Sequence, residues 1–426
     1  MFEEIKRLLG RAVNALSNKQ GLMSIGQVVE NLKPNESGKK YVLEEVSDYE
    51  QYKGNLYITF KRYRGLRGRA FRLETLSDKL RITEIIEEQP KASNIREFEK
   101  PNIFNFATSE LCQDAMFSWL IKWADDSFKT IDKQICLLGK KFLNRLTGIA
   151  INEIKSVSIK RQWKRIDILV IINEKELLII EDKTGTSIHD NQLQKYKDIV
   201  NKKYDNKTIK LHCAYVKTEN EPLDVERNIQ KQGYEIISRN DLLTVLNEYK
   251  GNHPLIVDYR SHLQTIEDCV NSYLKLPVNK WGWYAWQGFY KELESNLKID
   301  SWSYVSNPAG GFLGIWWHFV NIEDGNMYLQ IEQGKLCFKI HYKGDKDCSS
   351  IRWKYHRKII DNATRFGHNE IQKPDRFGAG THMTVAIVNP EDLFGTQEVD
   401  IRKVVNNLKT YQSIIDILMM DAFNEQ

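Results

Sequence analysis

The sequence lacks the features that mark secreted, membrane-spanning and zinc-stabilised proteins. Its six cysteines form no CxxC pair and have no histidine at ligand spacing, so we expect reduced thiols and no structural zinc site. No apolar run approaches the roughly 18 residues of a membrane span, and the acidic start does not resemble a signal peptide. Internal repeats and low-complexity tracts are also missing. These absences predict a soluble, cytoplasmic globular protein.

Charge and length leave more open. The net charge of +5 is compatible with a polyanionic partner but does not require one. A chain of 426 residues is long enough for two or three domains. Shifts in composition predict a small helix plus β-rich module at 1–100, an α/β domain at 101–277 and an aromatic-rich α+β domain at 278–426. The last of these contains seven of the ten tryptophans.

The first module combines a predicted amphipathic helix at residues 2–16 with strand-like stretches at 41–46, 56–63, 70–73 and 80–86. The turn between the middle two stretches is the most concentrated positive charge in the chain. We expect it to contact the backbone of a nucleic acid, although a solvated hairpin tip is an equally good interpretation. The residues concerned are Arg62, Arg64, Arg67 and Arg69.

Residues 165–183 read RIDILVIINEKELLIIEDK, and the other predicted elements surround this stretch. Two runs rich in Ile, Leu and Val flank a three-residue polar turn, which predicts an antiparallel hairpin of buried strands. If Ile172 pairs with Glu176, Asp167 lies directly opposite Glu181, where side chains are roughly 4.5–5.5 Å apart. Lys183 follows two residues later and shares the face of Glu181.

Two carboxylates held this close favour a bound cation. Magnesium or manganese prefers oxygen ligands, which Asp167, Glu181 and the backbone carbonyl of Asp182 can supply. Lys183 is then placed to hold or deprotonate a water beside a phosphodiester. The alternative is a solvated strand end, but an aspartate between Ile166 and Ile168 is costly without a partner.

These residues resemble the active-site signature of the PD-(D/E)XK nuclease superfamily: Asp167, then Glu181-Asp182-Lys183 after a hairpin. The segment from Gln192 to Tyr196 resembles a QLxxY element on the helix after the catalytic strand. Glu110, nine residues before Trp119-Leu120, resembles the first core helix of one branch. The proline of the superfamily's name is absent, since Ile166 precedes Asp167.

The resemblance implies a mixed sheet flanked by helices, with a helix, three strands, a helix and a further strand in that order. The expected strands are at 154–160, 168–172, 177–180, 211–216 and 234–237. The expected helices are at 110–123, 187–202, 254–276 and from 238 or 240 to 249, with Ser187 as the cap of the second. A cluster of basic residues precedes the first acid of the signature and suits a phosphate-bearing substrate. Its members are Lys160, Arg161, Lys164 and Arg165.

The implied activity is a Mg²⁺-dependent nuclease that cleaves phosphodiester bonds, with DNA as the expected substrate and a role in prokaryotic defence or genome maintenance. Its expected catalytic residues are Glu110, Asp167, Glu181, Lys183, Gln192 and Tyr196. Two alternatives stay open: a catalytically inactive nucleic-acid-binding module and an RNA-directed nuclease. Homo-oligomerisation also stays open. For the aromatic domain we favour an ordinary core over a platform that stacks bases or binds a regulator.

Overall fold

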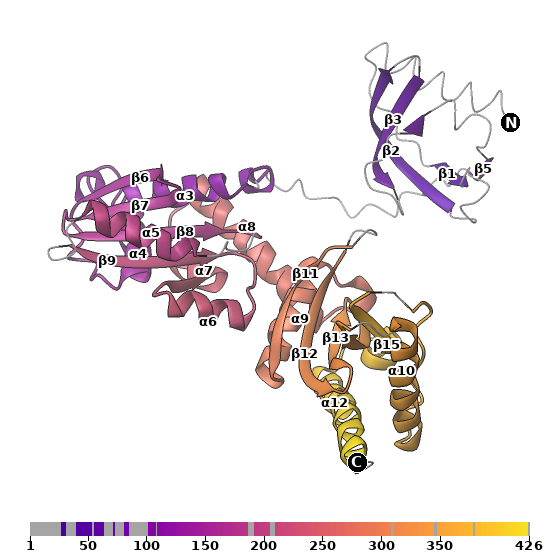
Figure 1. Ribbon diagram of the computed structural model, residues 1–426. Helices are drawn as coiled ribbons and strands as arrows, with labels where there is room; N and C mark the ends of the chain where they lie inside the picture. The colour runs from indigo at the N-terminus through magenta and orange to yellow at the C-terminus, as the bar shows by residue number, and fades with distance from the viewer. Residues whose placement is uncertain are drawn as a thin grey trace. The chain divides into compact units, whose positions relative to one another are not determined.

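The computed structural model describes the backbone of five strands within residues 1–100 and most of the chain from 101 to 424. In this second part, residues 108, 186–190, 205–208, 308–310, 345–346 and 378–379 lie outside the described set, and side chains are described as far as residue 418. The chain divides into two compact units, Met1–Lys100 and Pro101–Gln426 (Figure 1). Among the described helices, none combines the length and apolar character that a membrane crossing requires.

The first unit contains a five-stranded antiparallel sheet in the order β4-β3-β2-β1-β5. Its strands are β1 (Gln27–Glu30), β2 (Lys40–Tyr52), β3 (Asn55–Tyr63), β4 (Phe71–Arg72) and β5 (Arg81–Glu84). The last four correspond to the predicted stretches, whereas β1 is not predicted above.

Strands β3 and β4 pair antiparallel, with Tyr57 opposite Arg72, as the predicted hairpin requires. The backbone of Arg62 lies in β3 opposite Glu45. The turn with Arg64, Arg67 and Arg69 and the predicted helix at 2–16 lie outside the described residues. Nucleic-acid contact by this hairpin therefore stays a prediction.

A five-stranded mixed sheet forms the first half of the second unit, in the order β10-β9-β8-β7-β6. Strands β6, β7 and β8 are antiparallel, while β9 is parallel to β8 and β10 is parallel to β9. Their bounds are β6 (Val157–Trp163), β7 (Ile166–Ile172), β8 (Glu176–Lys183), β9 (Lys210–Lys217) and β10 (Glu235–Ser238).

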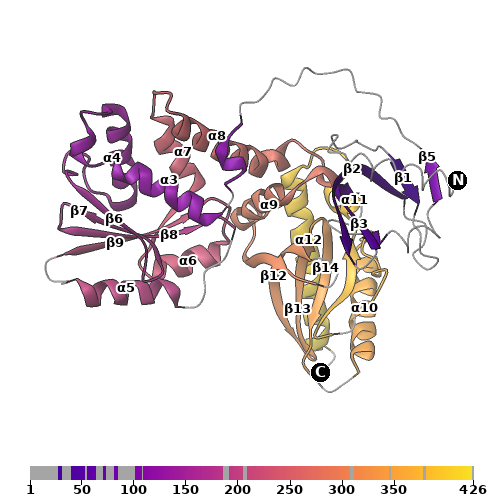
Figure 2. The same ribbon diagram turned by 90° about the horizontal axis from the view of Figure 1, so that it is seen from above.

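Helices cover both faces of this sheet, so the central strands are apolar on both sides. Val170 and Ile180 face a core formed with the helices of one side, and Leu169 and Ile179 face the core of the other. Figure 2 shows the two helical layers on opposite sides of the strands. One layer consists of α3 (Glu110–Lys122), α4 (Lys133–Thr147), α7 (Arg239–Asn247) and α8 (Pro254–Val270), and the other of α5 (Gln192–Lys203) and α6 (Leu223–Lys231).

The predicted order of helix, three strands, helix and strand is confirmed, but several boundaries differ. The first strand begins at Val157 rather than Ile154. Helix α5 begins at Gln192, so Ser187 is not its cap; Asn191 precedes the helix in the left-handed conformation, with φ 57°. Helix α8 ends at Val270 and continues as a 3-10 turn, Asn271–Leu274. Helices α4 and α6 are not predicted above.

The second half of this unit is an antiparallel sheet in the order β11-β12-β13-β14-β15 (Figure 1). The strands are β11 (Ile299–Val305), β12 (Phe312–Ile322), β13 (Gly325–Glu332), β14 (Lys335–His341) and β15 (His382–Val388). The helices are α9 (Trp283–Asn296), α10 (Cys348–Arg365), α11 (Pro390–Phe394) and α12 (Ile401–Asn424). Trp286, Trp302 and Trp317 are buried in a shared core, as expected for most of the aromatic side chains. Trp283 and Trp353 are exceptions, since each is more than a third exposed.

Candidate active site at the end of β8

The hairpin of β7 and β8 has the register that its sequence predicts. Ile172 pairs with Glu176, and Ile168 pairs with Ile180. Two of the three intervening residues are in the left-handed region, with φ 50° at Asn173 and 58° at Glu174. One further step along both strands brings Asp167 opposite Glu181, and Asp167 Oδ2 accepts a hydrogen bond from the backbone N–H of Asp182 at 3.1 Å.

The ammonium of Lys183 lies among four oxygen atoms at this end of the sheet. Its Nζ is 2.6 Å from Glu181 Oε1, 3.7 Å from Asp167 Oδ2 and 3.9 Å from Glu110 Oε2. It also donates to the backbone carbonyl of Asp182 at 3.0 Å. The structure thus brings together every residue predicted to hold the metal, together with Glu110 from the start of α3.

Burial makes these charges interdependent. Glu181 is fully buried, and its burial, followed by the Asp167 carboxylate, raises the pKa of Glu181 to about 8. Burial lowers the pKa of Lys183, but the Glu181 and Asp167 carboxylates outweigh it, so the pKa of Lys183 is raised. The cluster is therefore short of positive charge, because one ammonium faces several carboxylates.

A divalent cation fits this donor set. Glu181 Oε2 is buried and accepts no hydrogen bond, which leaves one carboxylate oxygen for a ligand. Within the described residues no group of three or more His, Cys, Asp and Glu side chains is arranged to hold a metal. Asp167, Glu181 and the Asp182 carbonyl instead supply two carboxylates and one backbone oxygen. Magnesium is commonly held by one or two carboxylates and keeps several waters.

The side chain of Asp182 points to the opposite face of the sheet, as the strand alternation predicts. Its Oδ1 accepts a hydrogen bond from Gln113 Nε2 at 2.6 Å, and Gln113 Oε1 accepts one from the Tyr259 hydroxyl at 3.0 Å. Burial raises the pKa of Asp182 well above its usual range. Only the backbone of Asp182 therefore belongs to the candidate site.

Helix α5 contributes the two predicted residues that follow the catalytic strand. Gln192 Nε2 donates to Glu181 Oε1 at 2.7 Å and lies 2.8 Å from the hydroxyl oxygen of Tyr196. The two side chains are one helical turn apart, which places them on one face of α5. They fix the orientation of the Glu181 carboxylate and leave its Oε2 unoccupied.

Two side chains at this site are missed by the sequence argument. Asp114 is almost fully buried, and its burial, followed by the charge of Asp167, raises its pKa to about 6. Gln162 Nε2 lies 3.1 Å from Asp114 Oδ2 and 3.2 Å from Asp167 Oδ1, so it links the two acids. Asp114 has no role in the predictions from sequence. The sequence feature that could have revealed Asp114 is a charged residue within a helix that is otherwise apolar on most faces.

The predicted basic cluster does not gather on one face of the sheet. Lys160 Nζ donates to the Tyr204 hydroxyl at 3.0 Å, beyond the end of α5, whereas Arg161 donates to the carbonyl of Leu111 on α3 at 3.2 Å. Lys164 and Arg165 are exposed in a turn with φ 54° and 71°. Phosphate contact by these four residues stays a prediction.

Helix α9 contacts the loop that follows β9. Glu219 N–H donates to the carbonyl of Thr184, one residue beyond Lys183, at 3.4 Å. The Glu219 carboxylate accepts hydrogen bonds from Trp283 Nε1 at 3.0 Å and from Gln287 Nε2 at 2.6 Å, both on α9. Helix α9 is thus connected to the backbone at the end of the candidate catalytic strand through one residue.

Comparison with protein families agrees with this geometry. Residues 101–275 match a family model described as PD-(D/E)XK nuclease superfamily. This range includes Glu110, all of β6 to β10 and both residues on α5. No curated protein and no solved structure matches the chain.

Proposed function

From the premise that residues 101–275 form a domain of the PD-(D/E)XK nuclease superfamily, we propose that the protein is a metal-dependent nuclease with DNA as its substrate and Mg²⁺ as its ion. A role in prokaryotic defence or genome maintenance is part of this proposal. The observation that supports it most is the convergence of Asp167, Glu181 and the Asp182 carbonyl on the Lys183 ammonium.

Each residue has a distinct task in this proposal. Asp167, Glu181 and the Asp182 carbonyl bind the cation, and Gln192 keeps the Glu181 carboxylate turned toward it. A bound Mg²⁺ lowers the pKa of a coordinated water and stabilises negative charge on phosphorus. Lys183 is within reach of all of these oxygens, and its raised pKa keeps it an ammonium. It would therefore orient the attacking water and stabilise the negative charge that develops on the phosphate.

Glu110 has a supporting task. Its Oε1 accepts a hydrogen bond from the backbone N–H of Thr184 at 3.2 Å, and its Oε2 is 3.9 Å from Lys183 Nζ. It therefore links the start of α3 to the end of β8 and holds Lys183 on the metal side. This arrangement favours an outer-shell role for Glu110 over direct binding of the ion.

The test is cleavage by the purified full chain of three substrates: supercoiled plasmid, linear duplex DNA and a single-stranded RNA of matched length. Each is incubated with Mg²⁺, with Mn²⁺ and with a chelator. The proposal predicts metal-dependent cleavage of DNA and none with the chelator. Cleavage of RNA alone would move the assignment to an RNA-directed nuclease. Binding of nucleic acid without any cleavage would favour the inactive binding module.

A further inference from the structure

A layer of aromatic rings lies at one end of the β11–β15 sheet, outside the residues of the candidate active site. Phe319 on β12 is 46 % exposed and stacks on Tyr328 of β13, with ring centroids 4.5 Å apart and planes at 12°. His341 on β14 stacks on His382 of β15 at 4.5 Å and 10°. The Tyr328 hydroxyl lies 3.0 Å from His382 Nδ1 and joins the two pairs.

The exposure of Phe319 follows from an irregularity in β12. The pairing of β12 with β13 shifts register between Trp317 and Val320, and His318 has φ 60°. His318 Nε2 is 2.9 Å from Asp416 Oδ1 on α12. Such irregularities change the direction of a side chain relative to the regular strand. Here His318 turns toward the helix and Phe319 turns toward solvent.

Two lysines, Lys339 and Lys343, lie near the histidine pair. Burial, followed by the charges of His341, Lys339 and Lys343, lowers the pKa of His382. Lys343 is exposed two residues beyond His341. The charge of Lys339 is already paired, because its Nζ is 2.9 Å from Glu332 Oε1. Among the residues that the structure describes here, Lys343 is therefore the cation best placed to attract an anion at this end of the sheet.

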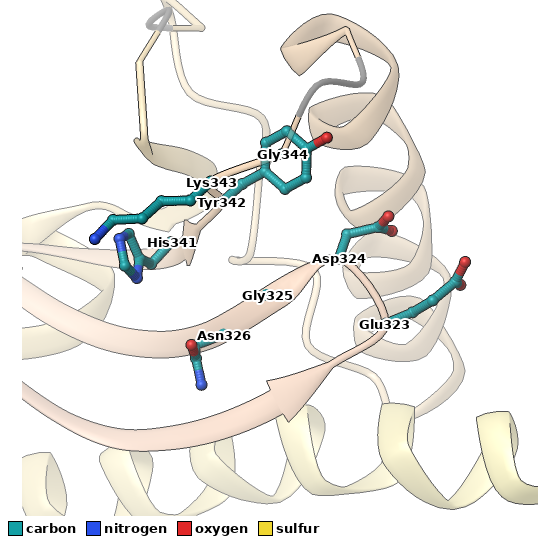
Figure 3. A pocket seen from close by; sticks show the side chains of 8 residues that line it. All are labelled: Glu323, Asp324, Gly325, Asn326, His341, Tyr342, Lys343 and Gly344. Carbon is teal, nitrogen blue, oxygen red and sulfur yellow. The ribbon is translucent and has the colours of Figure 1, made fainter.

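An open cavity adjoins the rings, with a volume of about 720 Å³. It is lined by Glu323, Asp324, Gly325, Asn326, His341, Tyr342, Lys343 and Gly344. In Figure 3 the side chains of His341 and Lys343 extend to one side of the cavity, and those of Glu323 and Asp324 point the other way. Both acids form ion pairs with Lys354 of α10, whose Nζ is 2.6 Å from Glu323 Oε2 and 2.7 Å from Asp324 Oδ2. The side with the histidine pair is therefore basic and aromatic.

We propose that this surface binds single-stranded nucleic acid: bases stack on Phe319 and the histidine pair, and a phosphate lies beside Lys343. Unpaired bases expose the flat faces that aromatic side chains stack on, whereas a duplex hides them. The cavity has the size that a nucleotide-sized ligand requires. The choice of a polynucleotide rests on the proposed function, but the site lies outside the matched residues and is separate from the cleavage chemistry.

The experiment measures binding of a fluorescent oligothymidine and of a duplex of equal length to the full chain, by anisotropy, with a chelator present to prevent cleavage. The variants are Phe319→Leu, which retains an apolar side chain over Tyr328, and Lys343→Ala. Matched controls are Phe366→Leu, at a phenylalanine that is 47 % exposed at the end of α10, and Lys409→Ala on the exposed face of α12. Thermal melting verifies that each variant is folded.

Phe319→Leu is expected to weaken binding of the single strand about tenfold, the order of one lost stacking contact. Lys343→Ala should reduce the dependence of its affinity on salt by about one phosphate contact. Both controls should bind like the parent. Parent-like binding by Phe319→Leu would overturn the proposal, and so would an equal loss for the duplex.

The outcome is separable from that of the nuclease proposal. If the parent cleaves nothing but its single-strand binding depends on Phe319, this site stands and the proposed activity fails. If the parent cleaves DNA and Phe319→Leu binds normally, the activity stands and this site fails.

Discussion

Two adjacent acids at the end of β8, Glu181 and Asp182, occupy opposite faces of the same sheet and differ in what surrounds them. Both are fully buried, and each has one carboxylate oxygen without a hydrogen-bond partner. Glu181 faces the Lys183 ammonium and the Asp167 carboxylate, whereas Asp182 faces the uncharged amide of Gln113. One face therefore concentrates charge, and the other forms a hydrogen-bonded network that suits a neutral acid.

The alternation of side chains along β8 places these two neighbouring acids in different environments. A buried charge is stable only when it is paired. The pKa of both acids is raised by burial, but only Glu181 lies beside groups that can pair its charge when it ionises. The β pleat supplies both environments within two residues. The comparison predicts that substitutions on the Glu181 face change chemistry and metal affinity, and that those on the Asp182 face change stability alone.

The largest expected effect comes from removing the ammonium. Lys183→Met retains most of the apolar stem and should reduce single-turnover DNA cleavage by about a thousandfold, within the range for loss of a group that stabilises transition-state charge. The matched control is Lys217→Met. Lys217 lies directly beside Lys183 on β9, is equally buried, and pairs with Glu221 at 3.0 Å. Lys217→Met should lower the melting temperature and retain cleavage. Equal loss of cleavage in both variants would mean that removing any buried lysine at this end of the sheet impairs cleavage, and that the position of Lys183 beside the acids is not the cause.

The next effect is on stability in the absence of metal. Because folding raises the pKa of Glu181 to about 8, from an ordinary value of 4.5, the folded state binds this proton more tightly than the unfolded chain. The resulting stability is fully present below about pH 4.5 and is lost as the pH rises toward 8. Each unit of raised pKa corresponds to about 1.4 kcal/mol, so the loss is a few kcal/mol.

Urea denaturation with a chelator present, at intervals from pH 5 to pH 8, measures this loss. Glu181→Gln has no proton to release and should show a flatter profile. A parent profile as flat as that of Glu181→Gln would contradict the charged environment inferred for this face.

The smallest expected effect is on the opposite face. Asp182→Asn retains an oxygen that accepts the Gln113 hydrogen bond, and the backbone carbonyl is unchanged. Cleavage should stay within about threefold of the parent, and the melting temperature at pH 7 should be equal or higher, since a buried carboxyl without a cation is replaced by a neutral amide. Loss of cleavage as large as that of Lys183→Met would show that the two faces are not independent.

The hairpin of this site is predictable because its causes are local. Two apolar runs and a three-residue turn determine the register, and the register determines which side chains meet. Asp167, Glu181 and Lys183 follow from that count alone.

The remaining residues depend on tertiary contacts. Gln162 reaches Asp114 and Asp167 only because its φ of 50° turns the end of β6 and because α3 packs beside it. Helix α4, by contrast, carries readable signals that the prediction overlooks. Asp132 accepts hydrogen bonds from two backbone N–H groups at its start, and Gly148 ends it with φ 73°.

The central claim is that the Glu181 face binds one divalent cation. The direct measurement is equilibrium binding of Mn²⁺ to the full chain, with free Mn²⁺ quantified by electron paramagnetic resonance, for the parent, Asp167→Asn and Asp182→Asn. The account predicts one Mn²⁺ bound by the parent and by Asp182→Asn, and at least tenfold weaker binding by Asp167→Asn, because the amide brings no negative charge to the ion. Equal Mn²⁺ affinity in the parent and Asp167→Asn, or no binding by the parent, would contradict it.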